Sequence, residues 1–559
     1  MTAPSPVSLE DVRKKLQAGL YQEGLDILSR IPAKSGVDCA LESLRGQALE
    51  GLGHLSQAEA AYWKALSAEE ERSPFPFLSL GLLKDRMGDR DRGLWVLEEG
   101  LRHFPDNIDL LREAGILYGL TGQWHRALPY ILGAYKRAPD RPENIMAFGP
   151  IVDRLELVEL YAEMHRAFSR LIERNPGNPD IQDWYGRSLE RIEKSGQALK
   201  FFRGLLRKAP RDTRLLGHVA RIARNINETG RALDTYRLLM EETGETADLL
   251  LAMAETHKMA GKPLAALPLI RHALAIDPDN PEARLLLGLV TVDQGDAEKA
   301  QLLLEEIDQA IAQYQLGDLF LRKKDSRRAA GALSRGFALR PDPHYAQELL
   351  SLLLSEGEDL LFLETLAFLR ILYPKAKVSQ SLLRKAGDRF PPLPSRGQAD
   401  NPETLAISGL AEAFLPGRDR TLAIRILEQA VTVDPLSEVL FWTLAMFDED
   451  AGRWLSAVNW YEKVKKNSRE PVTLLYRIAE NLHNDNPGMD PWPLLTEFAG
   501  FYGPMAGFYR VLASIVSRSD KDLSREILEQ GMQTFPEDPS LFSQYRALEP
   551  DRWNRLLAL

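Results

Sequence analysis

Apolar and polar positions along this chain follow the period of a helix rather than that of a strand. The pattern is clearest between residues 247 and 280, where two apolar stripes at three- and four-residue spacing are separated by Gly261 and end before Pro278. The two stripes consist of Leu250, Met253, Ala254 and His257, and of Ala266, Ile270 and Ala273. This segment therefore predicts a helical hairpin.

The same pattern recurs along most of the chain, and prolines mark where the hairpins end, because proline cannot continue a helix. Pro105 and Pro139 are 34 residues apart, as are Pro176 and Pro210. The full series of terminal prolines is Pro105, Pro139, Pro176, Pro210, Pro278, Pro341, Pro374, Pro435 and Pro536. The recurrence predicts a tandem array of hairpins.

This unit resembles the tetratricopeptide repeat, which has about 34 residues. In that repeat, large and small residues occupy the core positions of the first helix, alanine occupies a core position of the second helix, and proline stands at the end. The resemblance implies an all-α fold, a right-handed superhelical α-solenoid of helix-turn-helix units. Gly or Ala at the eighth position would let the helices approach closely, and a larger residue at the twenty-fourth would fill the space between them. In this family the outward positions of the first helices line a concave groove that holds peptides or partner helices.

The repeats predict five stretches of chain. We expect an N-terminal partial repeat or cap over 1–38, about ten repeats over 39–390, a Pro-rich break at 391–403, further repeats over 404–538 with an irregular segment at 472–504, and a solvent-facing capping helix over 539–559. The repeat at 281–309 is shortened, so the next begins about five residues early.

Closely spaced prolines at the start of the break at 391–403 favour an extended polyproline conformation, namely Pro391, Pro392 and Pro394. A linker between two arms is one interpretation. A PxxP ligand for another protein is the alternative.

Composition narrows the class of protein. With 44% hydrophobic and 27% charged residues the chain can build apolar cores, and its formal charge of −10 argues against a general nucleic-acid binder. No apolar run reaches the ~18 residues that a membrane span needs, and no basic region followed by an apolar stretch marks a secretory signal. We therefore expect a cytoplasmic protein. Cys39, the only cysteine, begins a predicted helix and is expected to pack in the core.

No catalytic motif stands out. The nine histidines are scattered without metal-ligand spacing, and the glycine patterns of phosphate cradles and nucleophile elbows are missing. His257 occupies a position where an aromatic core residue belongs, so a satisfied packing role is expected there. The sequence predicts no catalytic residue, metal or cofactor.

A cationic stretch is the first candidate binding surface. The ninth position of successive repeats runs through Ile116, Asp153, Arg187, Arg221 and Glu255. The candidate residues are Arg187, Arg191, Arg214, Arg221, Arg224 and Asn225. Arg187 and Arg221 should be neighbours and suit a carboxylate or an acidic peptide. Alternatively, acidic neighbours in the column pair with these arginines in a ladder of surface ion pairs.

An apolar patch is the second candidate. It consists of Leu285, Leu289, Val292, Ile311, Tyr314 and Leu321, at groove positions where polar residues are usual. Such a patch could take the apolar face of an amphipathic helix. Alternatively, the shortened repeat rotates these residues into the core.

Together these patterns predict a scaffold or adaptor that binds peptide or helical segments of other proteins, with no nucleic acid and no membrane span. The carboxylate clamp of the family, formed by Lys and Asn at set first-helix positions, is not reproduced. Two alternatives remain open. One is a component of a bacterial envelope machine for polysaccharide or protein export, and the other is an enzyme without a recognisable motif.

Overall fold

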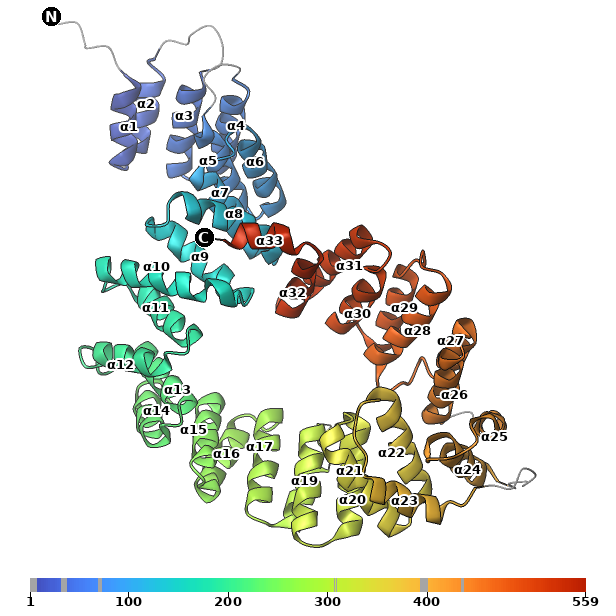
Figure 1. The fold of residues 1–559 in the computed structure, drawn as a ribbon. Coiled ribbons are helices and arrows are strands. Elements are labelled where there is room, and N and C mark those ends of the chain that lie inside the picture. The colour runs from blue at the N-terminus through green and yellow to red at the C-terminus, as the bar shows by residue number, and fades with distance from the viewer. Residues whose placement is uncertain are drawn as a thin grey trace, which may run out of the picture. The chain divides into compact units, whose positions relative to one another are not determined.

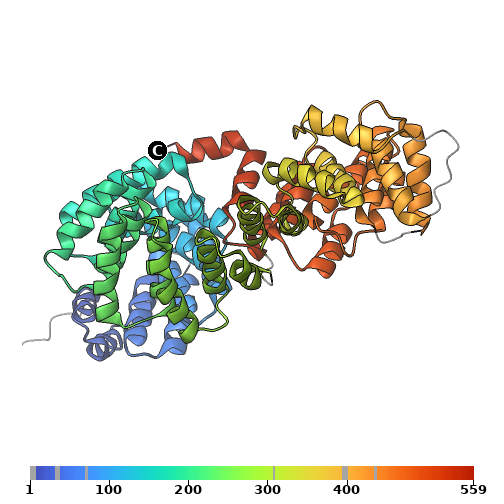
Figure 2. The same cartoon turned by 90° about the horizontal axis from the view of Figure 1, so that it is seen from below.

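The computed structural model describes residues 8–31, 38–68, 73–305, 307, 309–392, 401–433 and 437–558. In these residues, helices α1 to α33 follow one another in tandem, and the described part contains no strand (Figure 1; Figure 2). The chain divides into two compact units, unit 1 with residues 1–194 and 525–559, and unit 2 with residues 195–524. The predicted all-α array of hairpins is confirmed. None of the described helices is long and apolar enough to span a membrane.

Unit 1 begins with the N-terminal hairpins. Its helices up to residue 194 are α1 (Leu9–Gln17), α2 (Tyr21–Leu28), α3 (Cys39–Gly51), α4 (Leu55–Leu66), α5 (Pro74–Arg86), α6 (Arg90–His103), α7 (Ile108–Leu120), α8 (Trp124–Arg137), α9 (Pro142–Arg154), the 3-10 helix η1 (Val158–Leu160), α10 (Tyr161–Arg174) and α11 (Pro179–Arg191). It also contains the C-terminal helices. These are most of α31 (Lys521–Thr534), α32 (Pro539–Leu548) and α33 (Pro550–Leu557).

Unit 2 holds the remaining helices. They are α12 (Ser195–Leu206), α13 (Thr213–Asn225), α14 (Thr229–Thr243), α15 (Ala247–Met259), α16 (Pro263–Ile276), α17 (Pro281–Asp293), α18 (Ala297–Leu304), α19 (Ala310–Arg322), α20 (Ser326–Leu339), α21 (Pro343–Glu356), α22 (Asp359–Leu372), α23 (Gln380–Arg389), α24 (Pro402–Phe414), α25 (Arg420–Val433), α26 (Glu438–Asp450), α27 (Trp454–Glu462), α28 (Pro471–Asp485), α29 (Trp492–Tyr502) and α30 (Ala506–Val516).

Local chemistry sets where these helices begin and end. Asn280, for example, caps α17 by accepting a hydrogen bond from the Ala283 N–H at 2.9 Å, and Pro281 takes the first helical position. A residue with positive φ follows the first helix of most hairpins and is usually a glycine, such as Gly261 with φ 68°. At four of these turns the residue is Glu156, Glu193, Asn227 or Lys324.

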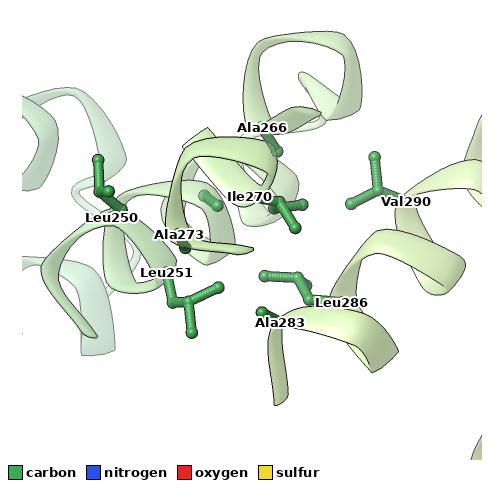
Figure 3. Packing of buried hydrophobic residues seen from close by; sticks show 9 residues of the cluster. Leu250, Leu251, Ala266, Ile270, Ala273, Ala283, Leu286 and Val290 are labelled. Atoms are coloured by element: carbon green, nitrogen blue, oxygen red, sulfur yellow. The ribbon is translucent and has the colours of Figure 1, made fainter. Parts of the chain in front are cut away.

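Buried apolar stripes hold the hairpins together. In α15 and α16 the predicted core residues Leu250, Ala266 and Ile270 lie within one cluster (Figure 3). Leu286 and Val290 of the next helix, α17, join the same cluster, so each hairpin completes the core of its neighbour. His257 is only half-buried, and its Nδ1 has no hydrogen-bond partner among the described residues, so the predicted satisfied packing role is not found.

A small residue in the first helix faces a large residue sixteen positions later in the second helix. A Cβ atom added to Gly317 would lie 2.4 Å from Leu333 Cδ2, and one added to Gly115 would lie 2.6 Å from Ile131 Cδ1. Gly81 and Leu97 repeat this arrangement. The predicted close approach of the helices is therefore confirmed.

The shortened repeat is also confirmed. Helix α18 has only eight residues, and α19 begins at Ala310. Helix α17 packs against both α18 and α19, as α5 packs against both α6 and α7.

The Pro-rich break lies mostly outside the described residues, because these exclude 393–400 and therefore Pro394. Pro435, which was predicted to end a hairpin, also lies outside the described residues. On either side of the break, α22 packs directly against α24, and the Arg418 guanidinium donates a hydrogen bond to the Phe390 carbonyl. Both helices belong to unit 2, because the compact units divide instead after Lys194 and after Ser524. The two arms predicted around 391–403 remain a prediction.

The C-terminal residues were expected to form one solvent-facing cap. They form α32 and α33 instead, and their apolar side chains Phe542 and Trp553 are buried. Helix α33 packs on α8 within unit 1, where Lys136 Nζ donates a hydrogen bond to the Leu556 carbonyl at 2.6 Å (Figure 1). Helix α33 is amphipathic, with Trp553 and Leu557 buried and Arg552, Asn554 and Arg555 exposed. The capping role of 539–559 stays a prediction.

A histidine of α8 is buried beside the C-terminal helix α32. The His125 side chain on α8 is 4% exposed and lies edge-on to the Tyr545 ring at 5.6 Å. Neither ring nitrogen has a hydrogen-bond partner in the described part of the chain. Burial, with a smaller effect of the Arg126 charge, lowers the pKa of His125 to about 4.

We expect substitution of Gly317 by alanine to lower the free energy of unfolding by about 1–3 kcal/mol, because the added methyl group overlaps Leu333. Gly331→Ala in the same hairpin is the control. A Cβ there meets nothing within 4 Å, so this change should stabilise α20 by about 0.5–1 kcal/mol. Urea unfolding of both variants checks the difference, and equal midpoints would contradict the packing described here.

We expect unit 1 to lose stability in acid through His125. Its pKa is lower in the folded than in the unfolded chain, so its contribution is complete above about pH 6.5 and is lost as the pH falls toward 4. This loss amounts to about 3 kcal/mol at pH 4. Urea unfolding at pH 7 and pH 4 should show a smaller acid effect for His125→Phe than for the native chain. His54→Phe, at an exposed position, should change nothing, and an unaltered acid effect in His125→Phe would refute the assignment.

Candidate functional site

The first two predicted arginines lie on α11 in unit 1 and share one carboxylate. Arg191 Nε donates to Asp153 Oδ1 at 2.5 Å, and Arg187 Nη2 lies 2.5 Å from Asp153 Oδ2. The hydrogen bond to Asp153 raises the pKa of Arg191 above its ordinary value. These contacts fit the alternative interpretation, in which the arginines belong to a ladder of ion pairs.

The other predicted cationic residues lie on or near α13 in unit 2. Arg224 Nη1 donates to Glu255 Oε2 at 2.8 Å, and Arg214 lies 3.8 Å from Asp212. Arg221 is half-buried, and Asn225 is exposed at the end of the helix. Because the two arginine groups belong to different units, a combined site at Arg187 and Arg221 stays a prediction.

The predicted apolar patch is mostly core. Val292 is 1% exposed, and Tyr314 is buried with its hydroxyl donating to the Arg340 carbonyl at 2.6 Å. Their expected exposure is therefore wrong. Leu285 and Leu321 are half-buried against the cluster around Leu316 and Phe320, Leu289 is half-buried, and Ile311 remains exposed. Val292 packs in the cluster that includes Leu304 of α18 and Leu316 of α19. Tyr314 is covered from the other side, where its ring stacks on Tyr345 at 4.1 Å.

A groove of about 680 Å³ lies in unit 1, between α7, α9 and the start of α11; we refer to it as the α7–α11 groove. Its apolar lining consists of Ile116, Leu120, Trp124, Met146, Ala147 and Pro150. Its polar lining consists of Arg112, Glu113, Glu143, Asn175, Asn178 and Asp180. The groove is thus an apolar floor with polar groups at its edges.

Small residues and one tryptophan shape the floor. The side chains of α8 lie close against the two glycines of α7. A Cβ on Gly115 would lie 2.6 Å from Ile131 Cδ1, and one on Gly119 would lie 2.9 Å from the Trp124 ring. The Arg154 guanidinium covers the same ring at 5.6 Å from its centroid. Leu120 is 54% exposed, which leaves apolar surface open at the edge of the groove.

A proline within α9 interrupts the hydrogen bonds of that helix. Pro150 has no N–H, so the carbonyl of Met146, four residues earlier, lacks its usual helical donor. Both residues line the groove. Helix α9 therefore carries one carbonyl without its helical donor at a residue that lines the groove.

The cationic group of the groove is already engaged. Arg112 Nη1 donates to Asp109 at 2.7 Å and Nη2 to Glu113 at 2.8 Å, and its side chain is 11% exposed. Burial alone would lower the pKa of Arg112, but the two carboxylates outweigh it and raise that pKa. Arg112 therefore offers little free charge to a ligand.

Only part of this groove could be found from the sequence. Ile116 stands in the ninth-position column and is apolar where polar residues are usual. Met146 and Pro150 lie where the repeat pattern is degenerate, so no periodic signal pointed to them. Among the described residues, no group of three or more His, Cys, Asp or Glu side chains could hold a metal ion.

Comparison with known proteins identifies the repeat. Residues 258–315 match the family model described as tetratricopeptide repeat. The CTR9 homolog of Arabidopsis thaliana is 28% identical over 95 residues, which are 16% of this chain and 9% of that protein, so the chain matches a small fraction of the relative's length.

Two solved structures are also similar. A tetratricopeptide repeat protein from Parabacteroides merdae is 18% identical with a TM-score of 0.33, over 45% of this chain and 98% of that one. YrrB, described as a TPR protein with an unusual peptide-binding site, is 19% identical with a TM-score of 0.27, over 32% of this chain and 93% of its own.

We expect Asp153→Asn to lower the free energy of unfolding by about 1–2 kcal/mol, because the buried carboxylate accepts from two arginines that are themselves partly screened by solvent. Glu255→Gln is the matched control. It removes the exposed partner of Arg224 and should cost less than about 1 kcal/mol. Urea midpoints of the two variants measure the difference, and a larger effect at Glu255 would contradict it.

Proposed function

The chain is a tetratricopeptide-repeat protein, and from this premise we propose that it is a scaffold or adaptor that binds peptide or helical segments of other proteins in the α7–α11 groove. A single hairpin cannot bury its apolar stripe alone, so stacked hairpins share a core and present their first helices side by side. Binding at such a surface is an equilibrium between the free and the occupied groove.

The open apolar floor carries this proposal. Side chains of Ile116, Met146 and Pro150 come from neighbouring first helices and line one concavity with the exposed Leu120. Apolar groups that a folded hairpin could bury are left accessible to a partner. The volume lies within the range of about 300–1,000 Å³ that is typical of ligand sites.

The geometry suits an extended or helical segment better than a compact small molecule. The lining runs from Arg112 on α7 to Ile181 on α11, across three first helices in sequence. A helix that lies across such a groove contacts it through residues three and four positions apart. Each buried apolar side chain of the partner then replaces water over the floor.

The proposal can be tested by placing a photo-crosslinking amino acid at Leu120 in the full chain in its native cells. We expect protein adducts at this position, because Leu120 borders the groove and is exposed. Leu302, which is 77% exposed on α18, is the matched control position and should give fewer adducts.

A second variant links the adducts to the groove. Met146→Glu places a charge on the apolar floor and should weaken binding of a partner about ten- to hundredfold, as for an interface hot spot. Adducts at Leu120 should then fall, while the circular dichroism of the chain is unchanged. Equal adducts at Leu120 and Leu302, or adducts insensitive to Met146→Glu, would refute binding at this site.

A further inference from the structure

We propose that the segment bound in the α7–α11 groove is amphipathic and carries lysine or arginine beside its apolar face. This inference rests on the proposed function and adds the chemistry of the partner. It follows from the charges and hydrogen-bond acceptors that surround the apolar floor.

The charged side chains of α7 and of the start of α9 have a net negative charge at the groove, even when their ion pairs are taken into account. Asp109, Glu113 and Glu143 face two arginines, Arg112 and Arg141. Arg141 lies 2.9 Å from Asp109 and 3.3 Å from Glu143, so it is shared between two carboxylates. Three acidic groups and two basic groups leave one net negative charge. The Glu143 side chain is 58% exposed and is the most accessible of the lining carboxylates in these pairs.

Helix α11 adds a second carboxylate. Asp180 lies exposed in the first turn of α11 and lines the groove. The neighbouring Asn178 caps the same helix by accepting from the Ile181 N–H at 3.2 Å. Exposed carboxylates on α9 and on α11 therefore border the apolar floor.

Helix α9 also has a backbone carbonyl that lacks its helical donor. The Met146 carbonyl lacks its helical donor because Pro150 has no N–H. An ammonium, a guanidinium or an amide N–H of a partner could donate to it. An acidic segment supplies no such side-chain donor and would meet Glu143 and Asp180 as like charges.

The acidic rim distinguishes this groove from the predicted site at Arg187 and Arg221, for which the sequence predicts an acidic partner. Opposite charges at the rim of an interface raise the association rate and set orientation, while the apolar contacts supply most of the affinity. The expected partner therefore has apolar residues three or four apart and basic residues outside that stripe. Its binding should weaken as salt screens the rim charges.

The experiment selects peptides from a random 12-residue phage library on the full chain and removes those that also bind the Met146→Glu chain. The remaining groove-dependent peptides should be enriched in Leu, Ile, Met or Phe together with Lys or Arg, and depleted in Asp and Glu. The most enriched peptide is then synthesised, and its dissociation constant is measured at low and high salt.

The rim carboxylates are tested with Glu143→Gln and Asp180→Asn combined. We expect the selected peptide to bind about fivefold more weakly at low salt, with a smaller difference at high salt. The matched control combines Glu282→Gln and Asp248→Asn, which remove acidic residues from the first turns of α17 and α15 in unit 2. This control should leave the affinity unchanged.

The outcomes separate the two proposals. If the groove-dependent peptides are acidic, or if basic peptides ignore the loss of Glu143 and Asp180, the inference about charge is overturned while groove binding stands. If no peptide depends on the groove, both the inference and the proposed function at this site are overturned.

Discussion

The contact of a small residue in the first helix with a large residue in the second sets the geometry of each hairpin. Gly115 against Ile131 and Gly317 against Leu333 leave no room for a Cβ atom. This close approach fixes the separation of the two helices and points the opposite face of the first helix away from the core. Gly115 and Ile131 themselves line the α7–α11 groove, so the apolar floor depends directly on this contact.

The hairpins, the turn at Gly261 and the short α18 could all be predicted, because helical periodicity and the restrictions on Pro and Gly act between neighbours in the sequence. The burial of Val292 and Tyr314 could not. Val292 is buried by Leu304 and Leu316 of the next two helices, and Tyr314 is buried by Tyr345 of the next repeat. Residue spacing does not determine these contacts between neighbouring helices. The floor around Pro150 was missed for a related reason, since the repeat pattern is weakest there.

Charge was the least reliable guide to the site. Arg187 and Arg191 look like ligand-binding groups in the sequence, yet Asp153 lies within 2.5 Å of both. Glu143 resembles any acidic residue that favours the start of a helix, and it lines the groove instead. Whether a charge is available to a partner depends on which groups lie within reach, and that is a property of the packing.

The left-handed residue between paired helices recurs even where glycine does not. Glu156, Glu193, Asn227 and Lys324 adopt this conformation at a cost of about 1–2 kcal/mol each relative to glycine. The apolar burial of each hairpin is large enough to tolerate that cost. The left-handed conformation of the turn residue thus keeps the number of residues between the paired helices constant. The amino acid at the turn can change without a loss of register between the helices.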